Sequence, residues 1–284
     1  MRALGKLVLL ALVAAGLAVA PSTVSAEPTW APAATAAIHP GTMMYTAGAQ
    51  CTANFVYTDD AGNVYVGYAA HCAGEGAATD TNGCNVDSVP LGTPVTFTND
   101  GSLLSEGTVV GRGTLVYSSW ITEHQLGTTD PNTCAYNDLA LVKVDAADVG
   151  KVNPSVPFWG GPTGIDTNGT AAGDRVYTYG NSSLRFGVSA LSPHTGVSLG
   201  DDAADGGWSH PLYTATPGVP GDSGSGFLSA DGTAIGTLST LGLAPLPASN
   251  NIGDLARELA FAQAHSGIAG LRLVLGTEPF DPAL

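Results

Sequence analysis

Charged residues are scarce in this sequence, and basic residues are the scarcest of them. Only 12% of the 284 residues are charged, and 9 Lys and Arg stand against 24 Asp and Glu, which gives a formal net charge of −15 at pH 7. A chain this acidic repels the phosphates of DNA and RNA and has no attraction for anionic membranes. We therefore expect no nucleic acid and no membrane surface among the partners of the protein.

Long hydrophobic runs are absent after the N-terminus. The one run there, residues 7–20, follows Arg2 and Lys6 and ends at Pro21. It is shorter than the about 20 residues that span a bilayer. A basic start, an apolar stretch and then small residues are typical of a secretory signal. We predict that residues 1–26 are a signal peptide and that the protein is secreted and extracellular; a membrane anchor is the alternative.

Segments with helical periodicity are almost absent, whereas turn-forming residues are abundant. The chain has 38 Gly and 18 Pro, a composition that argues against helical bundles and favours short strands joined by turns. The one convincing helix covers residues 254–265, where apolar residues recur at helical spacing, Asp254 can cap the start and Gly267 can end it. We predict an all-β protein with a C-terminal α-helix.

Cysteines are few, but their number is even. In a secreted chain, Cys51, Cys72, Cys84 and Cys134 indicate two disulfides. Three pairings are possible, and we favour Cys51–Cys72 with Cys84–Cys134, because the first would tie a strand to the turn that holds His71. A zinc site that uses His71 and cysteines is the alternative, although no paired CxxC spacing is present.

Turn-rich sequence divides the chain into parts. Residues 27–42 are rich in Ala, Pro and Thr and predict an extended N-terminal arm. Residues 145–172 hold repeated Gly and Pro that interrupt the strand pattern. We predict an N-terminal β unit at 43–155 and a C-terminal β unit with the helix at 156–284. The predicted strands are residues 54–57, 64–68, 95–98, 107–111, 114–118, 139–144, 175–179, 186–191, 226–229 and 233–240.

Ser223 lies in a glycine-rich turn, residues 221–226. A serine hydroxyl is a weak nucleophile until a base takes its proton. The glycines let the chain turn tightly and bring the N–H groups of Gly221 and Ser223 to one point, where they could stabilise an oxyanion. An ordinary hairpin turn is the alternative, because Gly, Asp and Ser are common turn formers. We predict Ser223 as a nucleophile, with Gly221 and Ser223 as the oxyanion hole.

His71 and Asp138 have the chemistry that such a serine needs. His71 directly follows a β-rich run and adjoins Cys72, whose disulfide would fix the backbone, and Asp138 precedes the alternating segment 139–144. A histidine within reach of the hydroxyl can act as general base and then acid, and an aspartate can hold its reactive tautomer. The alternatives are a structural or exposed histidine and an ordinary acid before a strand.

The three segments together resemble the signature segments of chymotrypsin-like serine proteases, in their secreted bacterial branch. They read AAHC at 69–72, DLAL at 138–141 and GDSG at 221–224, in the order His, Asp, Ser. The resemblance implies two antiparallel six-stranded β-barrels, one in each unit, with the site in the cleft between them. It also implies hydrolysis of peptide bonds through an acyl-enzyme, with no cofactor and no metal. Since the sequence gives no sign of oligomerisation, we expect a monomer.

The sequence departs from the family pattern around Asp222. Many animal members pair this acid with a new N-terminus, Ile-Val-Gly-Gly, which is released after a basic residue, and that string is absent here. By resemblance to bacterial relatives, we expect an internal arginine, Arg185 or Arg175, as the partner of Asp222. Ser225 also stands where glycine is commoner in the family.

The resemblance also bears on the substrate. Pro217 occupies the position, six residues before the nucleophile, where trypsin-like members have an aspartate, so we expect no preference for Lys or Arg. The segment Ser239, Thr240 and Leu241 resembles the strand that pairs with the substrate backbone. Ser239 could also support Asp138, and Leu241 could narrow the pocket. We predict a protein or peptide substrate with a small or medium apolar side chain at the cleaved residue.

Three functions are compatible with these residues. The leading hypothesis is a secreted serine endopeptidase with His71, Asp138 and Ser223 as its triad. The second is a catalytically weak, protease-like binding module. It is favoured by the absence of the Ile-Val-Gly-Gly N-terminus and by Leu241. The third is an esterase that uses the same triad.

Overall fold

The structure is a computed structural model that describes residues 28–77, 80–102, 104–242 and 249–283. The segment predicted as a signal peptide or anchor, residues 1–26, lies outside the described residues. Among the described residues, no helix has the length and apolar character needed to cross a bilayer.

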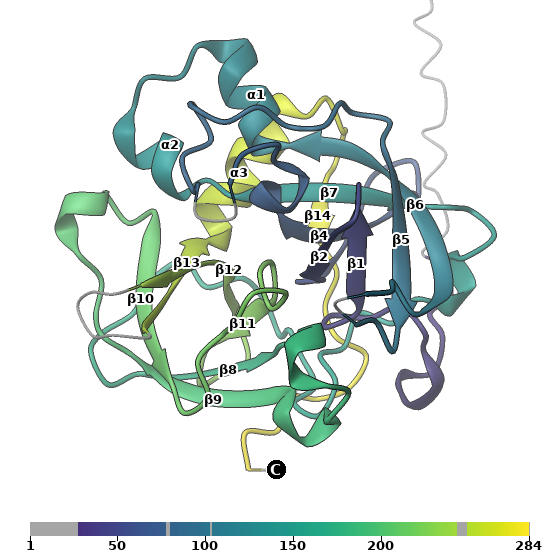
Figure 1. Ribbon diagram of the computed structural model, residues 1–284. Coiled ribbons are helices and arrows are strands. Elements are labelled where there is room, and N and C mark those ends of the chain that lie inside the picture. The colour runs from purple at the N-terminus through teal and green to yellow at the C-terminus, as the bar shows by residue number, and fades with distance from the viewer. Residues whose placement is uncertain (1–27, 78–79, 103, 243–248, 284) are drawn as a thin grey trace, which may run out of the picture.

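Two β structures lie against each other (Figure 1). The first is an eight-stranded antiparallel sheet with the order β14-β3-β4-β7-β6-β5-β1-β2, and the second is a closed barrel with the order β10-β13-β12-β11-β8-β9. The strands are β1 (Met43–Thr46), β2 (Ala49–Thr52), β3 (Val56–Thr58), β4 (Val64–Ala69), β5 (Pro94–Asn99), β6 (Thr108–Ser118), β7 (Leu139–Val144), β8 (Arg175–Tyr179), β9 (Pro193–Ser198), β10 (Ser209–Thr214), β11 (Gly226–Leu228), β12 (Ala234–Gly242), β13 (Ser249–Asp254) and β14 (Arg272–Leu273).

The predicted fold class, all-β with two units in the chymotrypsin-like arrangement, is confirmed. The second half is the expected six-stranded barrel. The first half differs in detail, because its sheet has eight strands and, in the described part of the chain, its edge strands β14 and β2 do not pair with each other. The strand β14 follows the barrel in sequence but pairs with β3, so the C-terminal segment returns to the first sheet.

Three α-helices accompany the strands, namely α1 (Ser119–Leu126), α2 (Pro131–Tyr136) and α3 (Leu255–His265). The predicted C-terminal helix is confirmed as α3, and the Asp254 carboxylate caps it by accepting a hydrogen bond from the Arg257 N–H. Neither α1 nor α2 was predicted. The helix α1 buries polar and apolar residues together, such as Trp120 and Glu123, so it lacks an apolar stripe that sequence could reveal.

Two strand predictions were wrong. Residues 186–191 alternate in polarity but form no strand: Phe186 caps one 3₁₀ turn, is 85% exposed and has a positive φ of 53°, and Ser189–Leu191 form another. Residues 107–111 and 114–118 were expected as two strands, whereas β6 runs through both, with a shift in its register against β7 between Leu115 and Tyr117. A bulge of this kind bends a strand without ending it.

The antiparallel pair β4 and β7 positions the first two candidate residues. In β7 every residue except Lys143 is buried, which explains its almost continuous apolar sequence. Ala69, the last residue of β4, lies opposite Leu139, the first residue of β7. Because the strands run in opposite directions, the chain leaving β4 towards His71 meets the chain that enters β7 from Asp138.

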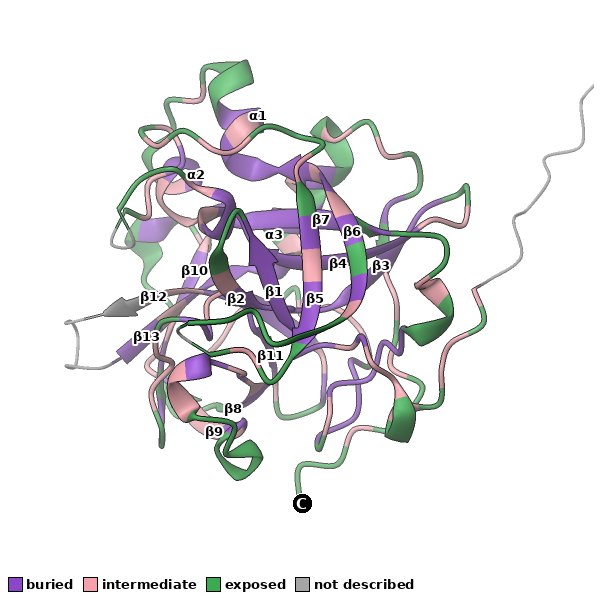
Figure 2. Cartoon of the chain, turned by 45° about the vertical axis from the view of Figure 1, so that its right-hand side comes forward, coloured by how far each residue is buried: buried purple, intermediate pink, exposed green. Residues whose placement is uncertain are grey.

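A shared apolar core fixes the two halves relative to each other. Phe55 and Leu139 of the first half pack in one buried cluster with Leu228 of the barrel and with Leu255 and Leu259 of α3. Figure 2 shows β3 and β4 in the colour of buried residues, whereas exposed residues gather mainly in the loops. Burial of side chains of this size stabilises the arrangement by roughly 1.5–3 kcal/mol each, so this core holds the two halves together.

Both disulfides have the predicted pairing. Cys51 is bonded to Cys72 and Cys84 to Cys134. The first bond ties β2 to the 3₁₀ turn Ala70–Ala73 that holds His71. Although the Cys51 and Cys72 sulfurs lie close to the His71 ring, both belong to a disulfide. The alternative of a zinc site with cysteine thiolates is therefore wrong.

Candidate active site

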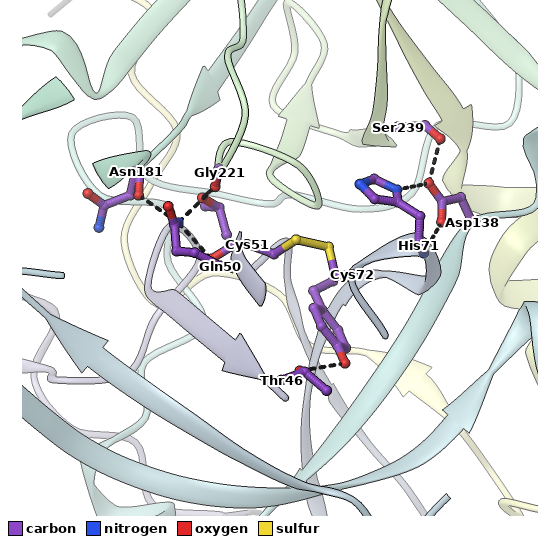
Figure 3. Close-up of a disulfide and its surroundings, with 11 residues drawn as sticks. Thr46, Gln50, Cys51, His71, Cys72, Asp138, Asn181, Gly221 and Ser239 are labelled. Carbon is purple, nitrogen blue, oxygen red and sulfur yellow. Dashed lines mark hydrogen bonds and ion pairs between the residues drawn. A yellow bond between two sulfur atoms is a disulfide. The ribbon is translucent and has the colours of Figure 1, made fainter. Parts of the chain in front are cut away.

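His71 and Asp138 form the central pair of the site (Figure 3). The His71 Nδ1 lies 2.7 Å from the Asp138 Oδ2, and the His71 backbone N–H donates to the Asp138 Oδ1 over 2.8 Å. The carboxylate thus holds both the ring and the backbone of the histidine. Because Nδ1 faces an acceptor, it carries the proton in the neutral ring, and the free Nε2 can act as a base.

The environment of His71 sets its basicity. Burial alone would lower the pKa of the imidazole, but the charge of Asp138 and its hydrogen bond outweigh burial and raise the pKa. The Trp120 ring lies at 6.4 Å from the imidazole, centroid to centroid. A histidine with a raised pKa, desolvated beside a buried carboxylate, is suited to accept a proton during a reaction.

Ser239 gives the carboxylate a further hydrogen bond. Its hydroxyl, on β12, donates to the Asp138 Oδ2, the same oxygen that faces His71. The hydrogen bond expected between these two residues is therefore present. Asp138 is 1% exposed, and its carboxylate oxygens accept from three donors, two on His71 in the 3₁₀ turn and one on Ser239 of β12.

Glycines bring the Ser223 turn close to the His71 turn. Gly224 has a φ of +89°, and a Cβ there would come within 2.6 Å of the Thr52 carbonyl oxygen and 2.8 Å of the Ala69 nitrogen. Only glycine permits this backbone conformation and this approach together. Ser223 and His71 consequently line the same cleft, with a volume of about 640 Å³.

The Ser223 backbone is held from β2, because its carbonyl oxygen accepts from the Thr52 N–H at 2.8 Å. Across the described ranges, the Ser223 hydroxyl has no hydrogen-bond partner, so the bond to His71 is not formed. In unliganded enzymes catalytic hydrogen bonds are often long and tighten only when substrate is bound. Ser223 and His71 nevertheless line the same cleft.

The turn also presents two free backbone donors. Within the part of the chain that the structure describes, neither the Gly221 N–H nor the Ser223 N–H donates to another group. The Gly221 carbonyl oxygen, by contrast, accepts from the Gln50 Nε2 at 3.0 Å and the Thr52 Oγ1 at 2.7 Å (Figure 3). These contacts from β2 fix the turn, and they leave the two N–H groups available to a negatively charged oxygen.

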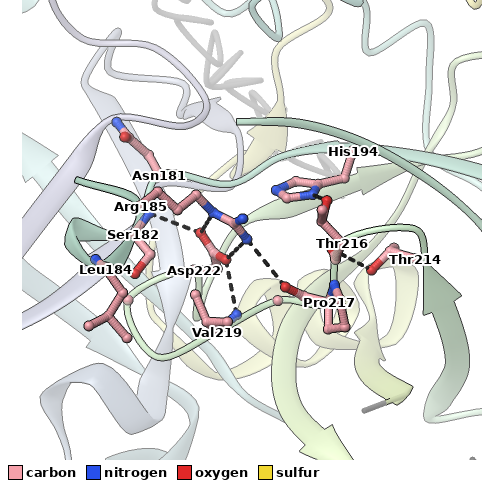
Figure 4. Close-up of polar contacts among 12 residues, drawn as sticks. Asn181, Ser182, Leu184, Arg185, His194, Thr214, Thr216, Pro217, Val219 and Asp222 are labelled. Carbon is pink, nitrogen blue, oxygen red and sulfur yellow. Dashed lines mark hydrogen bonds and ion pairs between the residues drawn. The ribbon is translucent and has the colours of Figure 1, made fainter. Parts of the chain in front are cut away.

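Asp222 anchors the turn from the other side (Figure 4). Its carboxylate forms an ion pair with Arg185, and it accepts from the backbone N–H of Ser182 at 2.9 Å and of Val219 at 3.0 Å. Of the two arginines expected, Arg185 is therefore the partner, whereas Arg175 lies over the Tyr177 ring. An internal cation, Arg185, therefore pairs with the acid of the Ser223 turn.

The predicted substrate-binding residues lie in different places. Ser239 and Thr240 line the cleft. Leu241 lies in β12 opposite Asn250, but its side chain is outside the described residues. Pro217 is not among the described residues that line the cleft, and its carbonyl oxygen accepts from Arg185.

Asn250 of β13 is a cleft residue that the sequence analysis missed. Its Oδ1 accepts from the Gly218 N–H at 2.8 Å, and its Nδ2 donates to the Thr240 carbonyl oxygen at 3.3 Å. The side chain thus joins two segments of the cleft wall. An asparagine in a strand gives no local signal, so only the strand pairing could have indicated it.

Three buried titratable groups also escaped the sequence analysis. Burial raises the pKa of Glu123 to about 9 and raises that of Glu258 well above its usual range. Burial lowers the pKa of His194 to about 4, and the nearby Arg185 adds to this effect. Among the described residues, His194 Nε2 and the Ser225 hydroxyl are buried without a hydrogen-bond partner. Both line a small cavity beside Asp222.

Known structures resemble the chain in fold. Thermobifida fusca Protease A covers 84% of this chain with 99% of its own, at 17% identity and a TM-score of 0.49. Nocardiopsis Protease covers 83% with 98%, at 17% identity and a TM-score of 0.47. Cellulomonas bogoriensis chymotrypsin covers 84% with 98%, at 15% identity and a TM-score of 0.45.

No protein-family model matches the chain, and no curated protein matches it in sequence. The likeness to these bacterial serine proteases concerns the fold alone. The evidence for the roles of the site residues is therefore the geometry of the cleft.

Proposed function

We propose that the protein is a secreted serine endopeptidase that cleaves peptide bonds through an acyl-enzyme. One observation carries the proposal: the His71–Asp138 pair, the Ser223 hydroxyl and two free backbone N–H groups belong to one cleft. Nucleophile, base and oxyanion donors in one place are the combination that acyl transfer requires.

In the proposed reaction, the Ser223 Oγ attacks the carbonyl carbon of the substrate while the His71 Nε2 takes the hydroxyl proton. The negative charge on the former carbonyl oxygen is stabilised by the N–H groups of Gly221 and Ser223. His71 then gives its proton to the leaving amine, and the C–N bond breaks. Water, activated by the same imidazole, hydrolyses the ester on Ser223 and restores the enzyme.

Asp138 keeps this cycle electrostatically favourable. Its carboxylate stabilises the imidazolium that forms when His71 is protonated, and its contacts with the His71 backbone and ring hold the reactive orientation. Asp222 and Arg185 have a different role, because they fix the turn that carries the oxyanion donors.

The proposed substrates have a small or medium apolar side chain at the cleaved residue. Support comes from the cleft wall, which includes Leu238, Gly218 and Asn250. The Asn250 side chain joins Gly218 to Thr240 by hydrogen bonds to both. None of the described residues that line the cleft is Asp, Glu, Lys or Arg. A panel of peptides that differ only at this residue tests the point, and strong preference for Arg or Glu would contradict it.

Secretion fits the two disulfides, which persist in oxidising compartments. The chain expressed with residues 1–26 should release a mature protein that begins after Ala26 into the medium. Retention of the full-length chain in the membrane fraction would contradict this part of the proposal.

A hydrolysis assay tests the function. The wild-type chain should cleave an alanine- or leucine-containing peptide, and Ser223→Ala and His71→Ala should each remove that activity. Turnover of a p-nitrophenyl ester without peptide cleavage would favour the esterase, and no turnover of either would favour the binding module. Thermal unfolding of each variant controls for loss of fold.

A further inference from the structure

A second carboxyl group lies directly behind the Asp138 backbone. Glu258, on α3, is 0% exposed. Its Oε1 accepts from the Asp138 backbone N–H at 3.0 Å, and its Oε2 is hydrogen-bonded to the Thr237 hydroxyl at 2.9 Å. Because the residue is fully buried, these two hydrogen bonds are the polar contacts that the structure describes for its carboxyl group. Glu258 is thus hydrogen-bonded to the residue that orients His71.

The contacts of Glu258 extend across the boundary between the two halves. The Thr237 hydroxyl, on β12 of the barrel, accepts from the Asn54 Nδ2 of the first half at 3.2 Å. The Asn54 Oδ1 in turn accepts from the Tyr57 hydroxyl at 3.3 Å. The Asp138 peptide is therefore connected through Glu258 to a side-chain network that spans the interface, in addition to its place in β7.

The surroundings of Glu258 favour its neutral form. The groups that face it are Asp138, Asp254 at the start of its own helix, Tyr57 of β3 and Tyr117 of β6. Two of these groups are acids, and none is basic. Burial and the charge of Asp138 both raise the pKa of Glu258. In the neutral carboxyl the proton sits on Oε2 and is donated to the Thr237 oxygen, while Oε1 still accepts from the Asp138 N–H, so no second negative charge lies beside the one that His71 needs.

We propose that Glu258 is a positioning residue, which holds the Asp138 backbone so that the Asp138 carboxylate meets the His71 ring. The inference rests on the proposed function for its kinetic consequences. The positioning itself can be tested without activity, because the position of the Asp138 carboxylate determines the basicity of His71 even in a catalytically inactive chain.

Substitution of Glu258 separates geometry from charge. Glu258→Gln is neutral and keeps an oxygen for the Asp138 N–H, so we expect a kcat within about threefold of wild type and an unchanged pH profile. Glu258→Ala removes the acceptor, and a shift of the carboxylate by a fraction of an ångström should lower kcat by about 10- to 100-fold with little change in KM. Its acid limb should move to lower pH, because His71 loses stabilisation of its charged form.

A stability control uses the same helix. Leu259→Ala removes a buried neighbour of Glu258 that packs in the core, so it should lower the melting temperature and leave the pH profile unchanged. Thr237→Val removes one hydrogen bond to Glu258 and should act like Glu258→Ala with a smaller effect. If Glu258→Ala does not fold, the comparison of kcat and pH profile between Glu258→Gln and Thr237→Val tests the proposal instead.

NMR titration of His71 in the Ser223→Ala background distinguishes this inference from the proposed function, because it needs no turnover. A His71 pKa that falls in the Glu258→Ala or Thr237→Val chain and is unchanged in Glu258→Gln supports the positioning role, even if the wild type proves inactive. Two results would overturn it: no change of the His71 pKa when the contact is removed, or a change as large in Glu258→Gln as in Glu258→Ala.

Discussion

Two buried aspartates support the site, and the structure stabilises them in opposite ways. Asp138 and Asp222 are each only 1% exposed. Asp222 has a full cation beside it, because Arg185 forms an ion pair with it. Asp138 has no permanent cation among the contacts that the structure describes, and it is satisfied by the His71 ring and backbone and by the Ser239 hydroxyl.

The difference follows from what each carboxylate must do. An ion pair with an arginine fixes a turn at every ordinary pH, which suits the backbone donors beside Asp222. A carboxylate whose charge is balanced only when His71 is protonated favours the imidazolium, which suits a residue beside the base. Under the proposed function, Asp138 would contribute most during proton transfer, whereas Asp222 would hold the geometry of the Ser223 turn throughout.

The largest expected effect tests the Asp138 half of this comparison. Asp138→Asn preserves shape but removes the charge and favours the wrong tautomer of His71, so kcat should fall by about 10⁴-fold. Steady-state kinetics measures it. Asp59→Asn is the matched control, since Asp59 is a buried aspartate in a turn away from the cleft. A loss in Asp138→Asn no larger than in this control would break the comparison.

The Asp222 half is tested through stability. Arg185→Met leaves a buried carboxylate without its cation, and removal of one partner of a buried pair costs about 3–5 kcal/mol. Urea unfolding measures this loss in the free energy of unfolding. Arg175→Met, in which the lost contact is a cation over a Tyr177 ring, should cost only about 0.5–1 kcal/mol. Equal losses in the two variants would show that Arg185 does not hold the turn.

A pH series sharpens the comparison, because His194 stands beside the Asp222–Arg185 pair. Its pKa of about 4 lies below the ordinary value of 6.5, so the unfolded chain binds the proton first as the pH falls. Stability should therefore decline between pH 6.5 and about 4, by about 3 kcal/mol for this group. His194→Gln should flatten that part of the urea-unfolding series. An unchanged slope in the variant would contradict the assignment.

The smallest effect concerns Asn250, which joins the Gly218 segment near Asp222 to Thr240 beside Ser239. Asn250→Ala should open the cleft wall and raise the relative kcat/KM for a leucine over an alanine substrate by about 10-fold, the value of an added methylene or two in an apolar pocket. Competition between the two peptides measures it. An unchanged ratio of kcat/KM for the two peptides would mean that other residues of the cleft determine the specificity.

Much of the site could be predicted from the sequence because its signals are local. His71 and Ser223 lie in short strings whose glycines and cysteine already limit the backbone, and Arg185 was one of two candidates for Asp222. The strand β7 is short and almost continuously apolar, so its position after Asp138 could also be predicted. Each of these signals lies within a few residues of the group it places.

The rest depended on contacts between distant segments. Residues 186–191 have the apolar alternation of a strand, but Phe186 points to solvent and no neighbouring strand receives the segment. Glu258 lies at helical spacing on the face defined by Leu255, Leu259 and Ala262, and an acid on an apolar face was the available signal. Without the structure, nothing indicated that the Asp138 N–H would meet it.

The most direct test of the account is covalent labelling of the wild-type chain with a fluorophosphonate, followed by peptide mapping. The account predicts one phosphonyl group per chain, on the Ser223 oxygen, with no adduct in Ser223→Ala and a strongly slowed reaction in His71→Ala. An unlabelled wild-type chain, or an adduct on a different serine, would contradict the claim that the three side chains act together in this cleft.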